Sequence, residues 1–397
     1  MCKLVKCFVH MELKMKAVIA PDSFKGTLGA AEVCEIAARA LDETFPGMEI
    51  LRLPLSDGGE GMAEAWRSAL GGTMRTATVS GPYGEAVQAQ WLLLPDGTAV
   101  LETASCAGLE LARAFELNPE RTTTHGLGEL MLCALESGAR RILLGLGGSA
   151  TCDAGCGMAH ALGWRFLDKH GEAFCPTGGT LIDIDRILPP EAAFPLAVTA
   201  ACDVDAPLYG PLGAACVYAP QKGADAAMVK RLDAGLRHIS AKVEQLPASS
   251  RLTSASCLGA AGGLGFGVRV FLGGELRSGI ELLLDYAGFD DMLADADFVI
   301  TGEGRMDAQT LQGKAPCGVL RRAQKRGVPV IAVCGCLGDG YEELLKAGFA
   351  AIYPAVTEPR DIDALRLTCR EDLYKAVQRA ASLHQFPFVL PESERNP

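Results

Sequence analysis

Four loops rich in glycine, in charged residues or in both each follow a short run of apolar residues. The loops are DSFKGT at 22–27, SDGGEG at 56–61, GLGGSA at 145–150 and GEGRMD at 302–307. A short apolar run that ends in such a loop is typical of a buried strand in a parallel sheet. Because ligands bind beyond the carboxyl ends of parallel strands, we expect these loops to converge on a ligand.

Helical patterns separate the apolar runs near both ends of the chain. Strands are predicted at 15–20, 48–55, 297–301, 328–334 and 350–354, and helices between them at 30–45, 315–326 and 342–347. A different rhythm begins near residue 73, where β-rich runs at 73–79, 87–94 and 98–103 are separated by short turns. This second pattern predicts a meander of antiparallel strands.

The predicted fold class is α/β, with two α/β domains. The first is a parallel-sheet, Rossmann/flavodoxin-like domain built from both chain ends, residues 15–74 plus 289–385. The second is an inserted mixed α/β domain, residues 75–288. Residues 1–14 form an N-terminal extension and residues 386–397 a tail. Contiguous domains divided near residue 140 are the alternative arrangement that the sequence leaves open.

Composition narrows the class of partner. The 397 residues are 49% hydrophobic and 21% charged, a balance typical of folded proteins, and they carry a net charge of −11. An acidic chain without a cluster of Lys and Arg residues lacks the positively charged surface that binds nucleic acid or an anionic membrane. The 15 cysteines are scattered, without zinc-ligand spacing, and no apolar run is long enough to span a membrane. We therefore expect a soluble, cytoplasmic protein with reduced thiols.

The loops carry the residue types that a phosphate ligand and a metal ion require, because glycines permit close backbone approach and carboxylates bind cations. Lys25 follows a strand and suits a phosphate clamp. Asp57 and Glu60 suit a substrate hydroxyl or a metal-bound water, or else a helix cap. Arg305 stands between Glu303 and Asp307, so we expect a guanidinium flanked by two carboxylates that binds a carboxylate or phosphate.

The loop at 145–150 is compatible with two interpretations, a dinucleotide-binding loop and a phosphate-binding loop. Gly145, Gly147 and Ala150 match the dinucleotide fingerprint G-x-G-x-x-A, and Asp168 follows 18 residues later. Against this, two further glycines lie where the crossover helix should begin, and each costs a helix about 1 kcal/mol relative to alanine.

In the second interpretation, the same loop surrounds a phosphate with backbone N–H groups. Asp153, just beyond it, then lies near enough to help hold Mg²⁺, and Asp203 at the end of another predicted strand is a second metal-ligand candidate. The segments 221–223 and 261–267 serve as additional ligand contacts or only as turns.

The six histidines give no support to a catalytic triad. Only His125, after three consecutive threonines, is placed at a distinctive position, and we assign it to the start of a helix.

Several motifs in order carry a resemblance to a known family. They are VIAPDSFKGTL, PLSDGGEG, TTHGLGEL, GLGGSATCDAGCGM, APQKGA, GAAGGLGFG, LRSGIELLLD and VITGEGRMD. From about residue 15 to residue 381 the chain resembles the bacterial glycerate kinase family. The family usually has Asn and Gly where Cys152 and Ala154 stand, and a small residue at Cys156.

The resemblance implies two α/β domains, one of them built from both chain ends, and a kinase that transfers the γ-phosphoryl group of ATP, with Mg²⁺, to a hydroxyl of D-glycerate. The product would be 2-phosphoglycerate or 3-phosphoglycerate, and a homodimer is left open. Two alternatives stay open: an NAD-dependent dehydrogenase that uses Gly145–Ala150, and a non-catalytic nucleotide-binding regulator.

Together with the loop chemistry, the resemblance gives each candidate residue a role. The catalytic candidates are Asp57, Lys25 and Arg305. The substrate-binding candidates are Ser23, Gly58, Gly59, Glu60, Glu303 and Asp307. The ATP-binding candidates are Gly145, Gly147, Gly148 and Ser149, and the Mg²⁺ candidates are Asp153 and Asp203.

Overall fold

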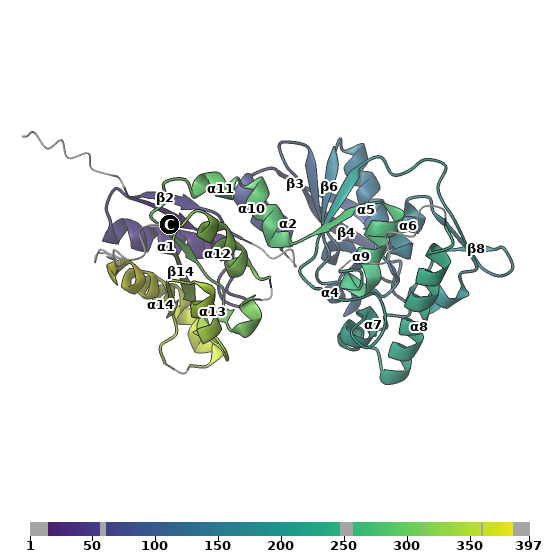
Figure 1. The fold of residues 1–397 in the computed structure, drawn as a ribbon. Helices are drawn as coiled ribbons and strands as arrows, with labels where there is room; N and C mark the ends of the chain where they lie inside the picture. Colours follow the sequence, from purple (N-terminus) through teal and green to yellow (C-terminus); the bar gives the residue numbers. More distant parts are fainter. Residues whose placement is uncertain (1–14, 56–60, 247–256, 312, 359, 384–397) are drawn as a thin grey trace, which may run out of the picture. The chain divides into compact units, whose positions relative to one another are not determined.

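The computed structural model describes residues 15–55, 61–246, 257–311, 313–358 and 360–383, and its contacts divide them into two compact units (Figure 1). The terminal unit contains the described residues up to Pro54 and from Gly288 onward, and the inserted unit contains those from Leu55 to Ala287. Helix α2 (Met62–Leu70) belongs to the inserted unit, whereas a boundary at residue 74 assigns it to the terminal domain.

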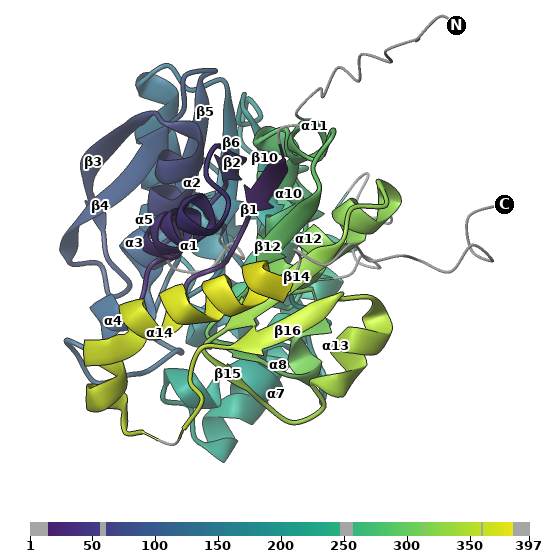
Figure 2. The same ribbon diagram turned by 90° about the vertical axis from the view of Figure 1, so that its left-hand side faces the viewer.

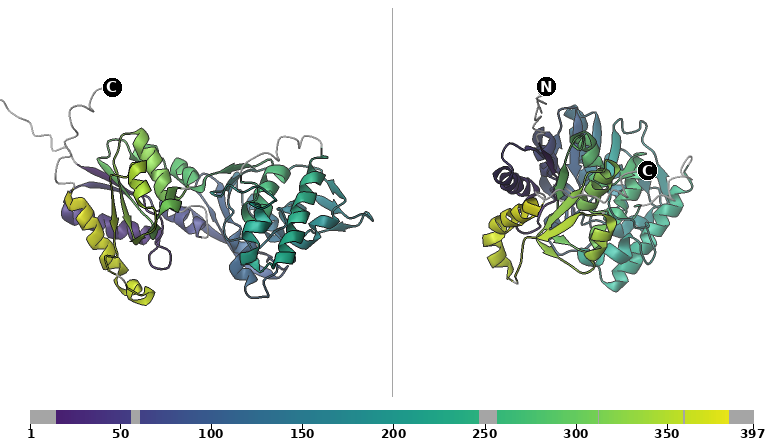
Figure 3. Two further views of the ribbon diagram at one scale, coloured as in Figure 1. Left: turned by 60° about the horizontal axis from the view of Figure 1, so that its bottom comes forward. Right: turned by 60° about the vertical axis from the view of Figure 1, so that its left-hand side comes forward.

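The terminal unit is built on a five-stranded parallel sheet. Its strands are β1 (Lys16–Ile19), β2 (Glu49–Arg52), β12 (Phe298–Thr301), β14 (Val330–Cys334) and β16 (Ala351–Pro354), in the order β16-β14-β12-β1-β2. Numbered along the chain within this unit, the order is 2-1-3-4-5, that of the flavodoxin-like fold. Figure 3 shows the purple and yellow-green segments from the two chain ends side by side in this unit. The predicted fold class is confirmed.

Helices cover both faces of this sheet. They are α1 (Ala30–Thr44), α11 (Phe289–Met292), α12 (Ala315–Lys325), α13 (Glu342–Ala347), α14 (Ile362–Leu383) and the 3₁₀ helix η3 (Ala308–Leu311). The helices α1 and α14 lie side by side (Figure 2) and share a core that includes Ala40, Leu41 and Val377. A short parallel pair, β13 (Arg305–Met306) and β15 (Cys336–Leu337), follows β12 and β14.

The inserted unit contains a mixed six-stranded sheet in the order β11-β10-β6-β5-β4-β3. Its strands are β3 (Thr73–Ser80), β4 (Ala86–Leu93), β5 (Thr98–Glu102), β6 (Arg141–Gly145), β10 (Ala197–Ala201) and β11 (Glu275–Arg277). The pairs β3–β4 and β4–β5 are antiparallel, which confirms the predicted meander. The pairs β5–β6, β6–β10 and β10–β11 are parallel.

A second, small antiparallel sheet in the inserted unit has the order β8-β7-β9, formed by β7 (Arg165–Leu167), β8 (Ala173–Phe174) and β9 (Arg186–Leu188). The remaining elements are α3 (Ala104–Ala107), α4 (Leu109–Ala112), α5 (His125–Glu136), α6 (Cys156–Ala161), η1 (Gly178–Asp183), α7 (Ala214–Tyr218), η2 (Pro220–Lys222), α8 (Ala226–Val243), α9 (Ala260–Phe271) and α10 (Gly279–Tyr286). Within α9, residues 261–263 have left-handed backbone angles that interrupt the helix. The start of the segment 261–267 therefore forms a turn, one of its two predicted roles, and its remaining residues are helical.

Within the described part of the chain, all thirteen cysteines are free thiols. None of the described helices combines the length and the apolar character that crossing a membrane requires.

Candidate functional sites

The terminal unit brings two of the predicted loops together. Loops 22–27 and 302–307 follow β1 and β12, the two strands between which the strand order reverses, and such a switch point is where doubly wound sheets bind ligands. The Asp22 N–H donates to the Gly302 carbonyl at 2.8 Å. The backbone of Gly304 lies against Phe24 and Lys25, so a Cβ at residue 304 would stand 3.3 Å from the backbone nitrogen of Lys25.

The first loop presents its cation to solvent. The Phe24 N–H donates to the Leu28 carbonyl at 2.8 Å, which closes a tight turn with the exposed residues Lys25 and Gly26 at its tip. Gly26 has a φ of +84°, a backbone conformation that residues with a Cβ rarely adopt. The Ser23 N–H donates to Asp22 Oδ1 at 2.6 Å. Lys25 is therefore accessible to an anionic ligand at the switch point, as a phosphate clamp requires.

The guanidinium of Arg305 contacts only one of the two carboxylates expected beside it. Arg305 forms an ion pair with Asp307 at 3.3 Å, and 63% of its side chain is exposed. Glu303 is instead buried, where it accepts a hydrogen bond from Thr310 Oγ1 at 2.6 Å and pairs with Lys314 at 3.1 Å. The expectation of an arginine between two carboxylates was wrong, because the Glu303 carboxylate is held by side chains of the following turn.

Two residues of this cluster escaped the sequence analysis. Neither Lys314 nor Thr310 lies in a pattern that predicts a contact with Glu303. Their pairing with Glu303 depends on the turn through η3, which brings residues seven and eleven positions apart into contact.

The loop at 56–61 lies almost wholly outside the described residues. Asp57, Gly58, Gly59 and Glu60 therefore stay predictions. The described start of α2 bears on the alternative helix-cap role: the Ala63 N–H donates to Glu102 Oε1 at 2.9 Å, so a side chain from β5 takes one of the donors that a cap residue would satisfy.

The glycine-rich loop of the inserted unit offers backbone donors to a ligand. It follows β6, and Gly148, with a φ of +73°, is exposed at its tip while Gly147 is half-buried. Within the described residues, no acceptor takes the N–H group of either glycine. Adjacent backbone N–H groups of glycines are the donors with which phosphate-binding loops hold phosphate oxygens.

A buried lysine supports this loop from within the unit. Lys222 Nζ donates to Ser149 Oγ at 2.9 Å and to the Thr151 carbonyl at 2.8 Å, and the residue is only 3% exposed. Burial lowers the pKa of Lys222 to about 8, although Cys152 and Asp153 oppose the shift. Residues 221–223 were predicted to form ligand contacts or turns, and nothing in their pattern indicated that Lys222 would hold the glycine-rich loop.

Asp153 is fully buried and saturated with hydrogen-bond donors. Its Oδ2 accepts from the Thr124 N–H at 2.7 Å, from Thr124 Oγ1 at 2.8 Å and from the Gly157 N–H at 3.2 Å, while Oδ1 accepts from the Gly155 N–H at 3.2 Å. Burial raises the pKa of this carboxyl group above its ordinary value, and the donors oppose the rise. A Mg²⁺ ion keeps several waters, so this enclosed carboxylate suits an anchor of the loop better than a metal ligand.

Asp203 follows β10 and contacts the start of a helix. Both of its carboxylate oxygens accept from the Gly279 N–H, at 3.1 and 3.2 Å, at the first residue of α10. It is half-buried, so its carboxylate remains partly accessible, and its role as a metal ligand stays a prediction.

The dinucleotide-binding alternative does not fit the local fold. In that fold the helix follows the glycine loop directly, and the acidic residue ends a neighbouring strand of the same sheet. Here α6 begins only at Cys156, and Asp168 lies in the turn between β7 and β8, which belong to the small antiparallel sheet. Asp168 accepts from the N–H groups of His170 and Glu172, so its carboxylate stabilises a hairpin turn.

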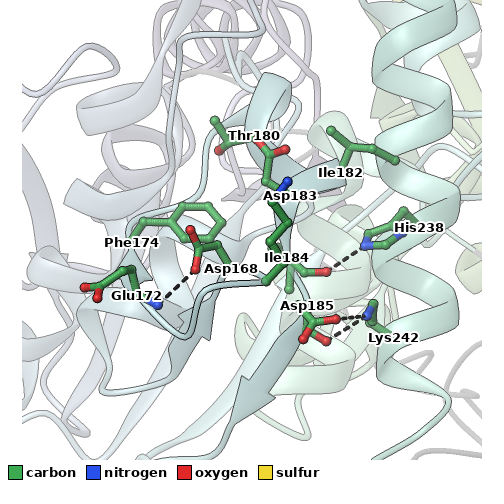
Figure 4. Close-up of a pocket in the computed structure, with 11 residues that line it drawn as sticks. Asp168, Glu172, Phe174, Thr180, Ile182, Asp183, Ile184, Asp185, His238 and Lys242 are labelled. Atoms are coloured by element: carbon green, nitrogen blue, oxygen red, sulfur yellow. Dashed lines mark hydrogen bonds and ion pairs between the residues drawn. The ribbon is translucent and has the colours of Figure 1, made fainter.

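A surface cavity in the inserted unit is lined by none of the residues predicted to bind ATP, Mg²⁺ or glycerate. Its lining includes Asp168, Glu172 and Asp183 from around the small sheet and η1, with His238 and Lys242 from α8 (Figure 4). Lys242 is paired with Asp185 at 3.0 Å. The excess of carboxylates makes this cavity a poor site for the anions ATP and glycerate.

The fold and the loops together define a class of protein: an α/β protein with a flavodoxin-like terminal unit, and with glycine-containing loops that follow parallel strands in both units. Comparison with known proteins identifies the family. Residues 17–385 match the model of the glycerate kinase family, and the chain belongs to that family.

Relatives at about 40% identity cover nearly the whole chain. A glycerate kinase of Bacillus cereus is 42% identical over 375 residues, 93% of this chain and 98% of its own length. A glycerate 2-kinase of Escherichia coli is 40% identical and spans 93% of this chain and 97% of its own length. A crystal structure provisionally assigned as glycerate kinase 2, from Salmonella typhimurium LT2, superposes with a TM-score of 0.83 at 36% identity, covering 94% of this chain and 98% of that one.

Proposed function

We propose that this protein transfers the γ-phosphoryl group of ATP to a hydroxyl of D-glycerate, and that Gly145, Gly147, Gly148 and Ser149 hold the phosphates of ATP. The observation that carries the proposal is the glycine-rich loop: among the described residues the N–H groups of Gly147 and Gly148 have no acceptor, and the buried Lys222 donates to the neighbouring Ser149. Phosphoryl transfer depends mainly on positioning and on offsetting negative charge, which N–H groups and cations supply.

The parts of the loop have separate tasks in this proposal. Gly147 and Gly148 donate to phosphate oxygens, and Lys222 fixes Ser149 and adds positive charge beneath them. Asp153 holds the following turn by accepting hydrogen bonds from the N–H groups of Gly155 and Gly157. Mg²⁺ bound with ATP would offset charge on the transferred group, and Asp203 is the residue we propose to help hold it.

On the terminal unit, we assign Lys25 and Arg305 to the neutralisation of phosphate or of the glycerate carboxylate. Both are exposed, and their loops pack together at the switch point of the sheet. Ser23, Glu303 and Asp307 shape this region, with Asp307 orienting Arg305 through its ion pair. Among the residues outside the described ranges, Asp57 remains our candidate for the base that orients the substrate hydroxyl, with Gly58, Gly59 and Glu60 beside it.

The test is an ADP-release assay on the purified full chain with saturating D-glycerate and ATP. We expect Lys25→Met to raise the KM for glycerate or ATP and Asp57→Asn to lower kcat by about 100-fold or more, the usual contribution of a general base. Lys169→Met is the matched control, because Lys169 is also an exposed loop lysine but lies in the β7–β8 turn.

Wild-type kcat and KM in both Lys25→Met and Asp57→Asn would remove these residues from the chemistry. If the wild-type protein releases no ADP with glycerate or other hydroxy acids but still binds ATP, a nucleotide-binding regulator becomes the better account.

A further inference from the structure

We propose that the inserted unit binds a divalent transition-metal ion such as Zn²⁺ through His125, His160 and Cys175. This group, which we call the His125 cluster, lies outside the sites assigned to ATP and glycerate. One potential ligand atom from each of its three residues lies within 4.8 Å of the other two. Imidazole nitrogens and a cysteine sulfur are the ligands that Zn²⁺ prefers in proteins.

Two of the three distances between the candidate ligand atoms match those around a tetrahedral metal ion. The two Nδ1 atoms of His125 and His160 are 3.4 Å apart, and the His125 Nδ1 is 3.7 Å from the Cys175 sulfur. Bonds of about 2.05 Å to nitrogen and 2.3 Å to sulfur at tetrahedral angles separate two nitrogens by about 3.4 Å, and a nitrogen from a sulfur by about 3.6 Å. A nitrogen pair at 3.4 Å is longer than ordinary N–H hydrogen bonds, so the rings gain little from each other alone.

The far side of the His125 ring has the partner that metal-bound histidines usually have. His125 Nε2 lies 3.5 Å from Glu129 Oε1, one turn along α5, and Glu129 Oε2 accepts from the Ser80 N–H at 2.6 Å. A carboxylate on one ring nitrogen fixes the tautomer and leaves the other nitrogen free to bind a metal. Glu129 is therefore a positioning residue for this site.

The cluster is accessible and joins separate elements. His125 begins α5, His160 lies in α6, and Cys175 follows β8. The side chain of His125 is 25% exposed, which gives an ion a path from solvent and leaves room for water as a fourth ligand. On binding, the Cys175 thiol proton passes to solvent, and the metal–sulfur bond ties the end of β8 to both helices.

The site also has a short connection to the glycine-rich loop. Thr123 Oγ1 lies 3.9 Å from the Cys175 sulfur and 3.4 Å from Asp153 Oδ2. Gly157 makes this approach possible, because a Cβ there would stand 2.0 Å from Thr123 Oγ1. A bound ion would therefore restrain the segment that holds Asp153.

The experiment is a Co²⁺ titration of the chelator-treated full chain, followed by competition with Zn²⁺. Co²⁺ is the probe because a cobalt–thiolate bond gives a charge-transfer absorption band that free Co²⁺ lacks. We expect one such band per chain, abolished by Cys175→Ser and retained by Cys336→Ser, which changes an exposed thiol elsewhere. Glu129→Gln should weaken Zn²⁺ binding roughly 10- to 100-fold, as is usual for the partners of metal-bound histidines.

His160→Gln separates loss of the metal from loss of the fold. It should reduce Zn²⁺ affinity at least tenfold, while His170→Gln, at an exposed turn, should not, and circular dichroism of the metal-free variants should match that of wild type. A charge-transfer band that persists in Cys175→Ser, or no band in the wild-type protein, would overturn the proposal. Neither result depends on kinase activity.

Discussion

Asp153 gives the sharpest test of how the glycine-rich loop is held. Replacing it with alanine leaves the buried N–H groups of Thr124, Gly155 and Gly157 without their acceptor. An orphaned buried N–H group costs about 1 to 3 kcal/mol, and removal of the buried charge recovers part of this sum. We therefore expect Asp153→Ala to lower the free energy of unfolding by about 3 to 5 kcal/mol.

For a unit of this size, that loss corresponds to a fall in melting temperature of roughly 6 to 20 °C, which differential scanning calorimetry measures directly. Asp153→Asn keeps the volume and one acceptor oxygen. It should lose only the bond to the Gly155 N–H, at a cost of about 1 to 2 kcal/mol. Magnesium activation curves should keep their midpoint in both variants. Wild-type melting together with a raised Mg²⁺ requirement would refute the anchoring role and restore Asp153 as a metal ligand.

Three further substitutions test other parts of the account. Lys222 has a folded-state pKa of about 8 against an ordinary 10.5, so the unfolded chain binds more protons between these values and stability should rise with pH across that window. Urea unfolding should show that the free energy of unfolding of the wild-type protein rises by on the order of 3 kcal/mol between about pH 7.5 and about pH 10, and that Lys222→Met lacks this rise. The same dependence of the free energy of unfolding on pH in both proteins would contradict the burial of a charged lysine. Ala154 has a φ of +56°, so Ala154→Gly should stabilise the protein by about 0.5 to 1 kcal/mol, and a lower melting temperature would count against backbone strain there. Glu303→Ala strands Thr310 and Lys314 and should cost about 2 kcal/mol in thermal unfolding, whereas an unchanged melting curve would show that the pair adds nothing.

Elements with a strong local pattern were predictable from the sequence. The apolar stripe over 30–45 gave α1, and the β-rich runs after residue 73 gave β3, β4 and β5, because burial of one face imposes a period that the sequence must carry. Helix α14 was not predicted: its apolar contacts are spread along a helix of 22 residues with many charged positions, so its weak periodicity hides the face that packs on α1.

The features of the candidate sites that could not be predicted from the sequence are contacts between residues far apart in the chain. The loops at 22–27 and 302–307 could be paired because strand ends and a sheet rule bring them together. The bond from Lys222 to Ser149 and the pairing of Glu303 with Lys314 depend on side-chain directions that no local pattern encodes. Nor does any spacing rule join His125 to Cys175, which come from a helix start and a strand end.

The most direct test of the central claim is phosphorus NMR of the reaction of the full chain with ATP, Mg²⁺ and D-glycerate. We predict that the γ-phosphate signal of ATP declines in a one-to-one ratio with the growth of a phosphomonoester signal, whose coupling to protons on carbon 2 or carbon 3 assigns 2-phosphoglycerate or 3-phosphoglycerate. Loss of the γ-phosphate only to inorganic phosphate, or an unchanged ATP spectrum while the protein binds ATP, would contradict the transfer of phosphate to glycerate.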